Sequence, residues 1–255
     1  LNSGDCAACH DAPTHHIKNG EWNNSRHAIA TRAASGPGEE SCVGCHTGAG
    51  FIGKMKAAET IDTSYTAINC QACHEPHGGT NPSDAKHIVR SMQSVTLADG
   101  TKVTEGGTGL LCMNCHQSRR NAKVYAATTA GSVRFGPHHG PQGDMLQGTN
   151  GFTYNQKIPS SGHKFAVDDT CVTCHMQAVA ETGKAFTQAG GHTFKVSWDG
   201  GSLTAACNNC HGELENFDMR RMDYDGDGNI DGVQTEVQHL LDKLSALLPP
   251  NDKPK

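Results

Sequence analysis

The chain has 255 residues, of which twelve are cysteine and sixteen are histidine, and its formal net charge is −5. Leu, Ile, Val and Phe make up only 39 residues, about 15% of the chain, which is below the roughly 20% at which ordered folding becomes doubtful. Burial of so few apolar side chains cannot offset the conformational entropy lost on folding, so a further source of stability such as a cofactor is needed. The negative charge argues against a nucleic-acid partner, and no apolar run is long enough for a transmembrane segment.

All twelve cysteines fall in six copies of one motif, C-x-x-C-H. This is the attachment signature of c-type haem, in which the two thiols form thioethers to the porphyrin and the imidazole binds the iron. A zinc site or a redox disulfide would not require a histidine directly after every second cysteine. The motifs therefore predict six haem c groups. The predicted thioether residues are Cys6, Cys9, Cys42, Cys45, Cys70, Cys73, Cys112, Cys115, Cys171, Cys174, Cys207 and Cys210. The predicted proximal iron ligands are His10, His46, His74, His116, His175 and His211.

Six porphyrins would supply the interior that the aliphatic side chains cannot. The fold class we expect is mostly irregular coil with short helices and one or two small β-hairpins, wrapped around a stack of six c-type haems. We expect a hexahaem cytochrome domain over residues 1–216 and a smaller region over 217–255. Without its cofactors the chain should be largely unfolded.

Four segments between the motifs carry local signals. Residues 22–34 predict a short helix capped by one of the two asparagines after Trp22. Residues 94–104 alternate apolar and polar around Asp-Gly, the pattern of a β-hairpin. Residues 131–163 are rich in Gly, Pro and Asn and predict an ordered loop laid over haems, and residues 193–198 alternate as a short strand does.

The region after the last motif opens like an EF-hand calcium loop, with acidic residues at alternate positions and glycine at the sharp turn. The usual closing glutamate is replaced by Gln234, so Glu236 would close a lengthened loop; a merely solvated acidic loop is the alternative. The candidate calcium ligands are Asp223, Asp225, Asp227, Asn229, Asp231, Gln234 and Glu236. Apolar residues at helical spacing then predict a C-terminal helix that Pro249 and Pro250 end.

Ten histidines remain after the six proximal ligands, enough to give every iron a second imidazole. His239 is the weakest of them, because it lies on the helix beside the acidic loop. With histidine in surplus, methionine ligation is not expected. Iron closed by two histidines has no open position for substrate, which favours electron relay over catalysis. The candidate distal ligands are His15, His16, His27, His77, His87, His138, His139, His163 and His192.

Several segments around these histidines resemble multihaem c-type cytochromes of metal-respiring bacteria, over about residues 1–215. They are Trp22–Ala28, Cys73–Gly78, His138–Leu146 and Gly162–Phe165. The resemblance is to the extracellular hexahaem OmcS/OmcE-like cytochromes, which form nanowire filaments.

The resemblance implies haems stacked in alternating parallel and T-shaped pairs, and non-catalytic long-range electron transfer in extracellular respiration. It also implies polymerisation, in which a histidine near one end of a subunit, here His15 or His16, ligates a haem of its neighbour. The partners would be redox proteins or extracellular electron acceptors, together with copies of the chain itself.

Location and two alternative functions stay open at this point. Covalent attachment of haem c takes place outside the cytoplasm, so we expect an extracellular or cell-surface protein, with the periplasm as the alternative. The chain opens without a basic-then-apolar leader, which we interpret as a removed signal peptide. The alternative functions are a multihaem reductase of a small nitrogen or sulfur oxyanion, with one open haem, and an electron-transfer subunit of an outer-membrane porin–cytochrome complex.

Overall fold

A computed structural model describes residues 17–29, 39–60, 66–75, 89–90, 92–128, 138 and 140–248. Its contacts divide the chain into two units, Leu1–Lys195 and Val196–Lys255. The division falls before the sixth motif, so that motif shares the second unit with the acidic loop. No helix in the described part of the chain is both long and apolar enough to cross a membrane.

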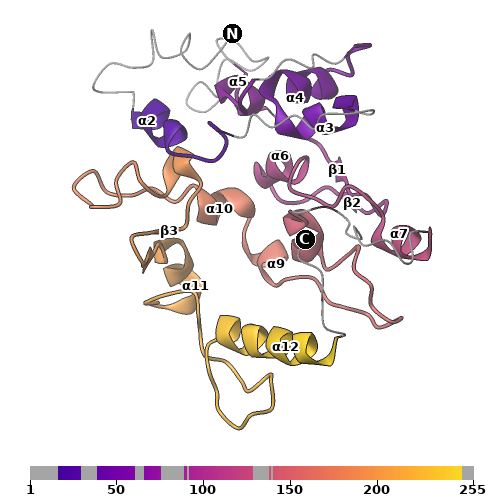
Figure 1. Cartoon of the computed structure of the whole chain (residues 1–255). Coiled ribbons are helices and arrows are strands. Elements are labelled where there is room, and N and C mark those ends of the chain that lie inside the picture. Colours follow the sequence, from indigo (N-terminus) through magenta and orange to yellow (C-terminus); the bar gives the residue numbers. More distant parts are fainter. Residues whose placement is uncertain are drawn as a thin grey trace. The chain divides into compact units, whose positions relative to one another are not determined.

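The first unit is built from short helices and one small hairpin (Figure 1). The elements in chain order are α2 Ile17–Asn23, α3 Glu39–His46, α4 Gly48–Met55, α5 Cys70–Cys73, β1 Val95–Thr96, β2 Lys102–Val103, α6 Gly109–Met113, α7 Ala122–Thr128, α8 Gln142–Gln147, α9 His163–Ala166, α10 Cys171–His175 and the 3-10 turn η2 Gly191–Thr193. None of these exceeds eight residues, so tertiary contacts must hold them in place.

The hairpin predicted over residues 94–104 is confirmed. β1 and β2 pair antiparallel, with Val95 opposite Val103. The turn closes where the Leu97 amide donates to the carbonyl of Thr101 at 2.9 Å and Gly100 adopts φ +92°, a conformation that glycine tolerates at no steric cost. The inner face packs on Leu110 of α6, which leads directly into the fourth C-x-x-C-H motif.

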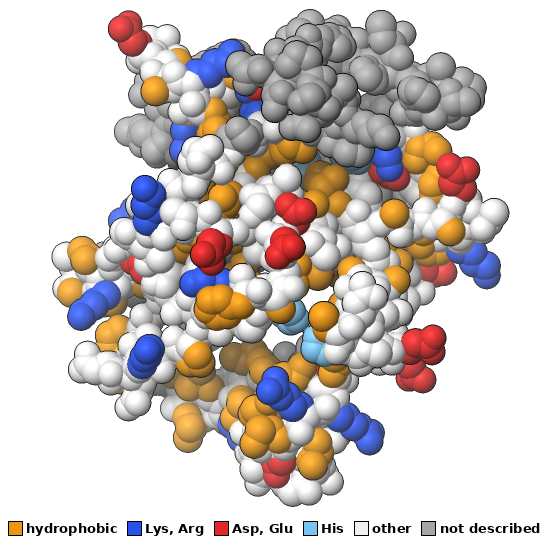
Figure 2. Space-filling view, turned by 180° about the vertical axis from the view of Figure 1, so that it is seen from behind, with side chains coloured by type: hydrophobic (Ala, Val, Ile, Leu, Met, Phe, Trp, Pro, Cys, Tyr) orange, Lys and Arg blue, Asp and Glu red, His pale blue; other side chains and the backbone are white. Residues whose placement is uncertain are grey.

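A second apolar cluster joins the helices of neighbouring motifs. Phe51 of α4, Ala72 of α5 and Leu111 of α6 are its buried members. In the described part of the chain only ten apolar residues are buried in all, as the composition predicts. Many large apolar side chains instead lie on the surface (Figure 2), among them Phe152 and Phe165.

The helix predicted over residues 22–34 is wrong in its position. α2 runs from Ile17 to Asn23 and ends where the predicted helix was to begin. The asparagines do not cap a following helix; Ser25 turns the chain, and its hydroxyl accepts from the amide of Ala28 at 3.3 Å. Polar side chains that compete for backbone groups favour such turns over helix interiors. Residues 30–34 of the prediction lie outside the described part.

Two other local predictions need correction. The stretch predicted as loop over residues 131–163 contains helix α8, which Gly148 ends in the left-handed conformation, with φ +64°. The stretch predicted as strand over residues 193–198 starts as the end of η2 and is strand only at Ser197–Trp198. Phe194, at φ +58°, interrupts the extended backbone between them.

The second unit holds a small hairpin, the sixth motif and one long helix. Its elements are β3 Ser197–Trp198, β4 Gly201–Ser202, the 3-10 turn η3 Ala205–Cys207, α11 Asn208–His211 and α12 Val233–Leu247. The predicted C-terminal helix is confirmed as α12. Its first turn is capped by the carboxylate of Asp218, which accepts from the amides of Gln234 at 2.7 Å and Thr235 at 3.1 Å. A capping carboxylate also suits the positive end of the helix dipole.

Candidate cofactor sites and the acidic loop

Five of the six C-x-x-C-H motifs lie in the described part of the chain, and each folds as about one helical turn. They lie on α3, α5, α6, α10 and η3–α11. In the third and fourth motifs the histidine amide donates to the carbonyl of the first cysteine, at 2.8 and 2.9 Å. Residues at i, i+3 and i+4 share one face of a helix. The two thiols and the imidazole of such a motif are therefore presented together, as one planar cofactor would require. The first motif, Cys6, Cys9 and His10, lies outside the described residues.

Polar caps fix where these turns begin. The side chain of Asn69 accepts from the amide of Ala72 at 3.2 Å and starts α5 at the first cysteine of the third motif. At the fourth motif, the carboxylate of Asp169 accepts from the amide and the hydroxyl of Thr108, both at 2.8 Å. Asp169 lies two residues before the fifth motif, so this contact also ties the fourth motif to the fifth.

Three motif histidines each lie opposite a predicted distal ligand. The ring centroids are 6.0 Å apart for His46 and His138, and 6.0 Å apart for His74 and His192. They are 6.1 Å apart for His116 and His27. Metal–imidazole bonds of about 2 Å place two ring centres about 6 Å apart across one metal ion. Separations of this size are compatible with two histidines that share one metal.

The remaining distal candidates divide into two groups. His163 begins α9, where its Nδ1 lies 3.4 Å from the hydroxyl of Ser161. The other candidates, His15, His16, His77, His87 and His139, lie outside the described residues.

Burial keeps one histidine pair neutral. Burial, followed by the nearby His116, lowers the pKa of His27 to about 4. Burial likewise lowers the pKa of His116, although a hydrogen bond with Gln142 works in the opposite direction. Neutral imidazole is the form that binds metals. At neutral pH both rings are thus in the state that a shared metal needs.

Two of the candidate histidine ligands, His175 and His192, have hydrogen-bonding partners near Nδ1 that orient their rings. The Nδ1 of His175 lies 3.0 Å from the carbonyl oxygen of Phe194. The buried carboxylate of Glu21 accepts from the amide of His192 at 2.9 Å and lies 3.4 Å from its Nδ1. Burial opposes ionisation of Glu21, but the hydrogen bonds from His192 and the charge of Lys18 prevail, so its pKa is lowered. Contacts of this kind leave Nε2 as the metal-binding nitrogen.

Phe194 also lies at the meeting point of several motifs. Its ring is 4.6 Å from that of His27 and 6.2 Å from that of His192, while its carbonyl faces His175. These three histidines belong with the fourth, third and fifth motifs. Neither Glu21 nor Phe194 was singled out from the sequence, because nothing local distinguishes them from other residues of their type.

Cysteines of different motifs touch each other. The thiols of Cys45 and Cys115 lie beside each other, and each is close to the carbonyl that precedes its partner, at 3.7 Å from Asn114 and 4.0 Å from Gly44. The thiol of Cys112 likewise lies beside that of Cys171. The fourth motif is therefore in direct contact with the second and the fifth.

The thiols do not assemble a zinc site in the described residues. There, only two groups bring three candidate ligand atoms within 4.8 Å of one another, and neither includes a cysteine. No disulfide joins the ten cysteines of this part of the chain. Burial raises the pKa of Cys73 to about 11, and the nearby Cys70 acts in the same direction.

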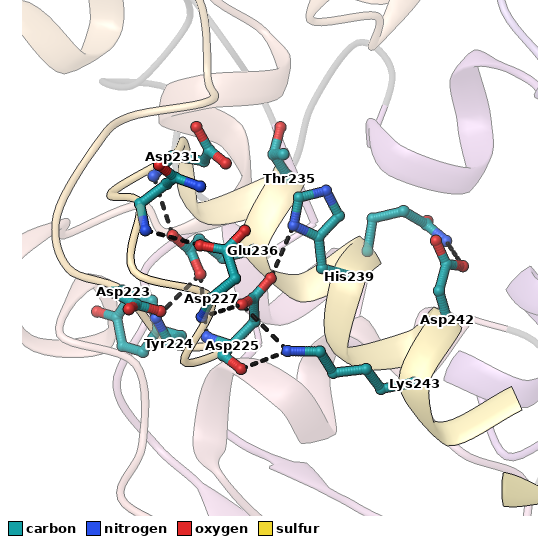
Figure 3. Close-up of polar contacts among 12 residues, drawn as sticks. Asp223, Tyr224, Asp225, Asp227, Asp231, Thr235, Glu236, His239, Asp242 and Lys243 are labelled. Atoms are coloured by element: carbon teal, nitrogen blue, oxygen red, sulfur yellow. Dashed lines mark hydrogen bonds and ion pairs between the residues drawn. The ribbon is translucent and has the colours of Figure 1, made fainter. Parts of the chain in front are cut away.

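Both metal-ligating groups lie in the acidic loop before and along α12 (Figure 3). One consists of Asp223, Asp225 and Glu236, and the other of Asp225, Asp227 and His239. Carboxylate oxygens at this spacing suit a hard cation such as calcium.

Glu236, and not Gln234, closes this loop. Its carboxylate is buried and accepts from the amides of Tyr224 at 2.9 Å, Asp225 at 3.0 Å and Asp231 at 2.9 Å (Figure 3). The amide of Gln234 instead bonds Asp218 at the start of α12. The loop geometry thus agrees with the lengthened loop expected from the sequence.

Two side chains of α12, those of His239 and Lys243, contact the same loop. The Nδ1 of His239 lies 2.7 Å from Asp225, and the ammonium of Lys243 lies 3.2 Å from it. Burial raises the pKa of Asp225, but the hydrogen bonds from Lys243 and His239 outweigh it and leave the pKa lowered. His239 therefore faces the acidic loop, as its place in the sequence indicated, and Lys243 is a partner that the sequence did not indicate.

Comparison of the chain with protein-family models, with curated proteins and with solved structures gives no match.

Proposed function

We propose that the chain is a hexahaem c-type cytochrome that transfers electrons without catalysing a reaction. The observation that carries this proposal is the set of three histidine pairs, each made of one C-x-x-C-H histidine and one predicted distal histidine about 6 Å away. Haem c would supply a one-electron iron couple at each site. The cysteines of the six motifs would hold it covalently, and the paired imidazoles would bind its iron.

The apolar surface of the first unit supports a large bound cofactor. Its buried clusters are small, and Phe152, Tyr154 and Phe165 remain 61%, 80% and 72% exposed. Exposed apolar side chains that lie close together, as Phe152 and Tyr154 do, can be covered by a bound ligand. A porphyrin held by adjacent motifs would provide the missing apolar partner.

The contacts between motifs favour relay over an isolated reaction centre. Thioether sulfurs lie at the porphyrin edge, so the contact of Cys45 with Cys115 would bring the second and fourth haems edge to edge. The contact of Cys112 with Cys171 would do the same for the fourth and fifth. The fourth motif would then be the central point of the relay.

The place of this relay in the cell is part of the proposal. We infer an extracellular or cell-surface protein, with the periplasm as the alternative, that passes electrons to redox partners or extracellular acceptors. A filament of copies sharing a ligand such as His16 between subunits is the assembly that its resemblance to nanowire-type cytochromes implies. The absence of a described membrane-crossing helix is compatible with this assembly.

Calcium is the cation proposed for the acidic loop. Asp223, Asp225, Asp227 and Glu236 would supply carboxylate oxygens, and binding would relieve the repulsion among them. The backbone amides that donate to the Glu236 carboxylate already hold the loop in a closed form. Calcium would thus stabilise the second unit and take no part in electron transfer.

The test is spectroscopic. The chain is produced in a host that attaches haem c, and its haem content and axial ligation are measured by pyridine haemochrome absorption and electron paramagnetic resonance. We expect six covalent haems per chain, all low-spin, and no binding of carbon monoxide to the reduced protein. A chain without covalent haem would refute the proposal. One haem that binds carbon monoxide in every molecule would favour the reductase alternative.

A further inference from the structure

Glu21 is a buried carboxylate that the proposed electron relay does not by itself require. It lies on α2, and its side chain is 7% exposed. A buried carboxylate is costly unless it is fully hydrogen-bonded. Its partners are Lys18, at 3.2 Å from both carboxylate oxygens, and His192, which lies 171 residues further along the chain.

The contact with His192 is made by two different groups of that residue. Its amide donates to Oε2 of Glu21 at 2.9 Å, and its ring Nδ1 lies 3.4 Å from the same oxygen. One oxygen therefore holds both the backbone and the ring. An imidazole whose Nδ1 donates to a carboxylate carries its lone pair on Nε2.

Gly191, the residue before His192, leaves space for the carboxylate of Glu21. A side chain at Gly191 would place its Cβ 2.4 Å from Oε2 of Glu21, and Gly191 has φ +47°. Glycine is the residue that combines this backbone conformation with so close an approach. The turn η2 is thus shaped around the carboxylate as well as around His192.

We infer that Glu21 is a positioning residue for His192: it holds the ring in the tautomer and orientation in which Nε2 faces the position shared with His74. The inference rests on the proposed function, because it assigns Glu21 to the axial ligand of the third haem. The ring of His192 lies 6.0 Å from that of His74, so Glu21 supports the pair from behind. Loss of the carboxylate should free His192 and open one iron position.

The experiment compares variants of the haem-loaded full chain. Glu21→Ala removes the acceptor, and Glu21→Gln keeps an oxygen that accepts from the amide and ring of His192. The matched control is Glu75→Ala, because Glu75 follows His74 directly, pairs with Arg90 at 3.8 Å and is 48% exposed. The control also removes one carboxylate charge near His74 and His192, but Glu75 makes its ion pair with Arg90 and not with His192.

We expect Glu21→Ala to keep six haems but to convert one of them to high spin, with carbon monoxide bound at one site per chain. Added imidazole should restore the low-spin signal, since it replaces the lost ligand and would not repair a merely loosened fold. Glu21→Gln and Glu75→Ala should stay fully low-spin.

Gly191→Ala provides a second route to the same contact, because its methyl group would displace the carboxylate from the opposite side. Gly191→Ala should also convert one haem to high spin. This variant keeps the inference testable if the Glu21→Ala protein cannot be produced. Six low-spin haems in both variants would overturn the inference and leave the proposed function intact. High spin at several haems, or no response to imidazole, would show a general structural role and overturn it as well. A wild-type chain without haem would overturn the proposed function itself, and this inference with it.

Discussion

The region around the fourth motif and the acidic loop with α12 are held together by different means. At the fourth motif, apolar residues such as Leu110 and Met113 pack against a hairpin, and the cysteines of three motifs touch. In the acidic loop, the buried Glu236 accepts three backbone amides. The apolar clusters of the first region are small, and in the second region several carboxylates surround the single ammonium of Lys243. Each region thus suits the partner proposed for it: a large planar cofactor in one, and a cation in the other.

The largest effect should come from removing cofactor attachment at the fourth motif. We expect replacement of Cys112 and Cys115 by serine to unfold much of the first unit, because this motif contacts the second and the fifth. The matched control is the same change at Cys207 and Cys210 of the sixth motif, which lies in the second unit. Hydrogen exchange would measure both. Equal loss of protection in the first unit from the two variants would contradict a central role for the fourth motif.

The next effect is a pH dependence carried by His27. Its pKa is lowered to about 4, so the unfolded chain binds more protons and stability is lost as the pH falls from 6.5 toward 4. A shift of this size corresponds to about 3 kcal/mol of unfolding free energy. Denaturant titrations of the haem-bound chain would measure the slope. His27→Ala should flatten the slope, and an unchanged slope in this variant would refute the assignment.

A smaller effect is expected in the acidic loop. Glu236→Gln keeps the shape of the side chain but replaces a charged acceptor by a neutral one. We expect a loss of about 2 kcal/mol in the second unit, typical of hydrogen bonds to charged groups, and weaker stabilisation by calcium. Thermal unfolding with and without calcium would measure both. The control is Gln234→Ala at an exposed position; if it abolished the calcium effect instead, the standard loop assignment would be right.

The smallest effect should follow Phe194→Leu. The change removes the ring contact with His27 at 4.6 Å but leaves the carbonyl that faces His175. Loss of one aromatic contact should cost about 1 kcal/mol, seen as a lower unfolding midpoint. The haems should all remain low-spin by electron paramagnetic resonance, in contrast to the outcome expected for Glu21→Ala. A high-spin signal would mean that the ring itself holds a ligand in place.

Features that depend on neighbouring residues could be predicted from the sequence alone. The hairpin at residues 95–103 follows from alternation around Asp-Gly, and α12 follows from apolar residues at helical spacing. The closing role of Glu236 follows from its offset in the loop. Each of these features depends on the periodicity or spacing of residues that are close in the sequence. The amino-acid sequence alone contains that information.

The tertiary structure alone decided which distant residues meet. His27 pairs with His116, and His192 with Glu21, across intervals that no local pattern records. It also decided that α2 ends at Asn23, because the Trp22 indole donates to the carbonyl of Ile68 at 2.8 Å and Ser25 turns the chain toward His27. Such contacts close long loops of the chain, and the entropic cost of closing a loop grows only slowly with its length. Many alternative pairings of distant residues therefore have a similar entropic cost. Packing and burial select among them, and only the folded chain contains that information.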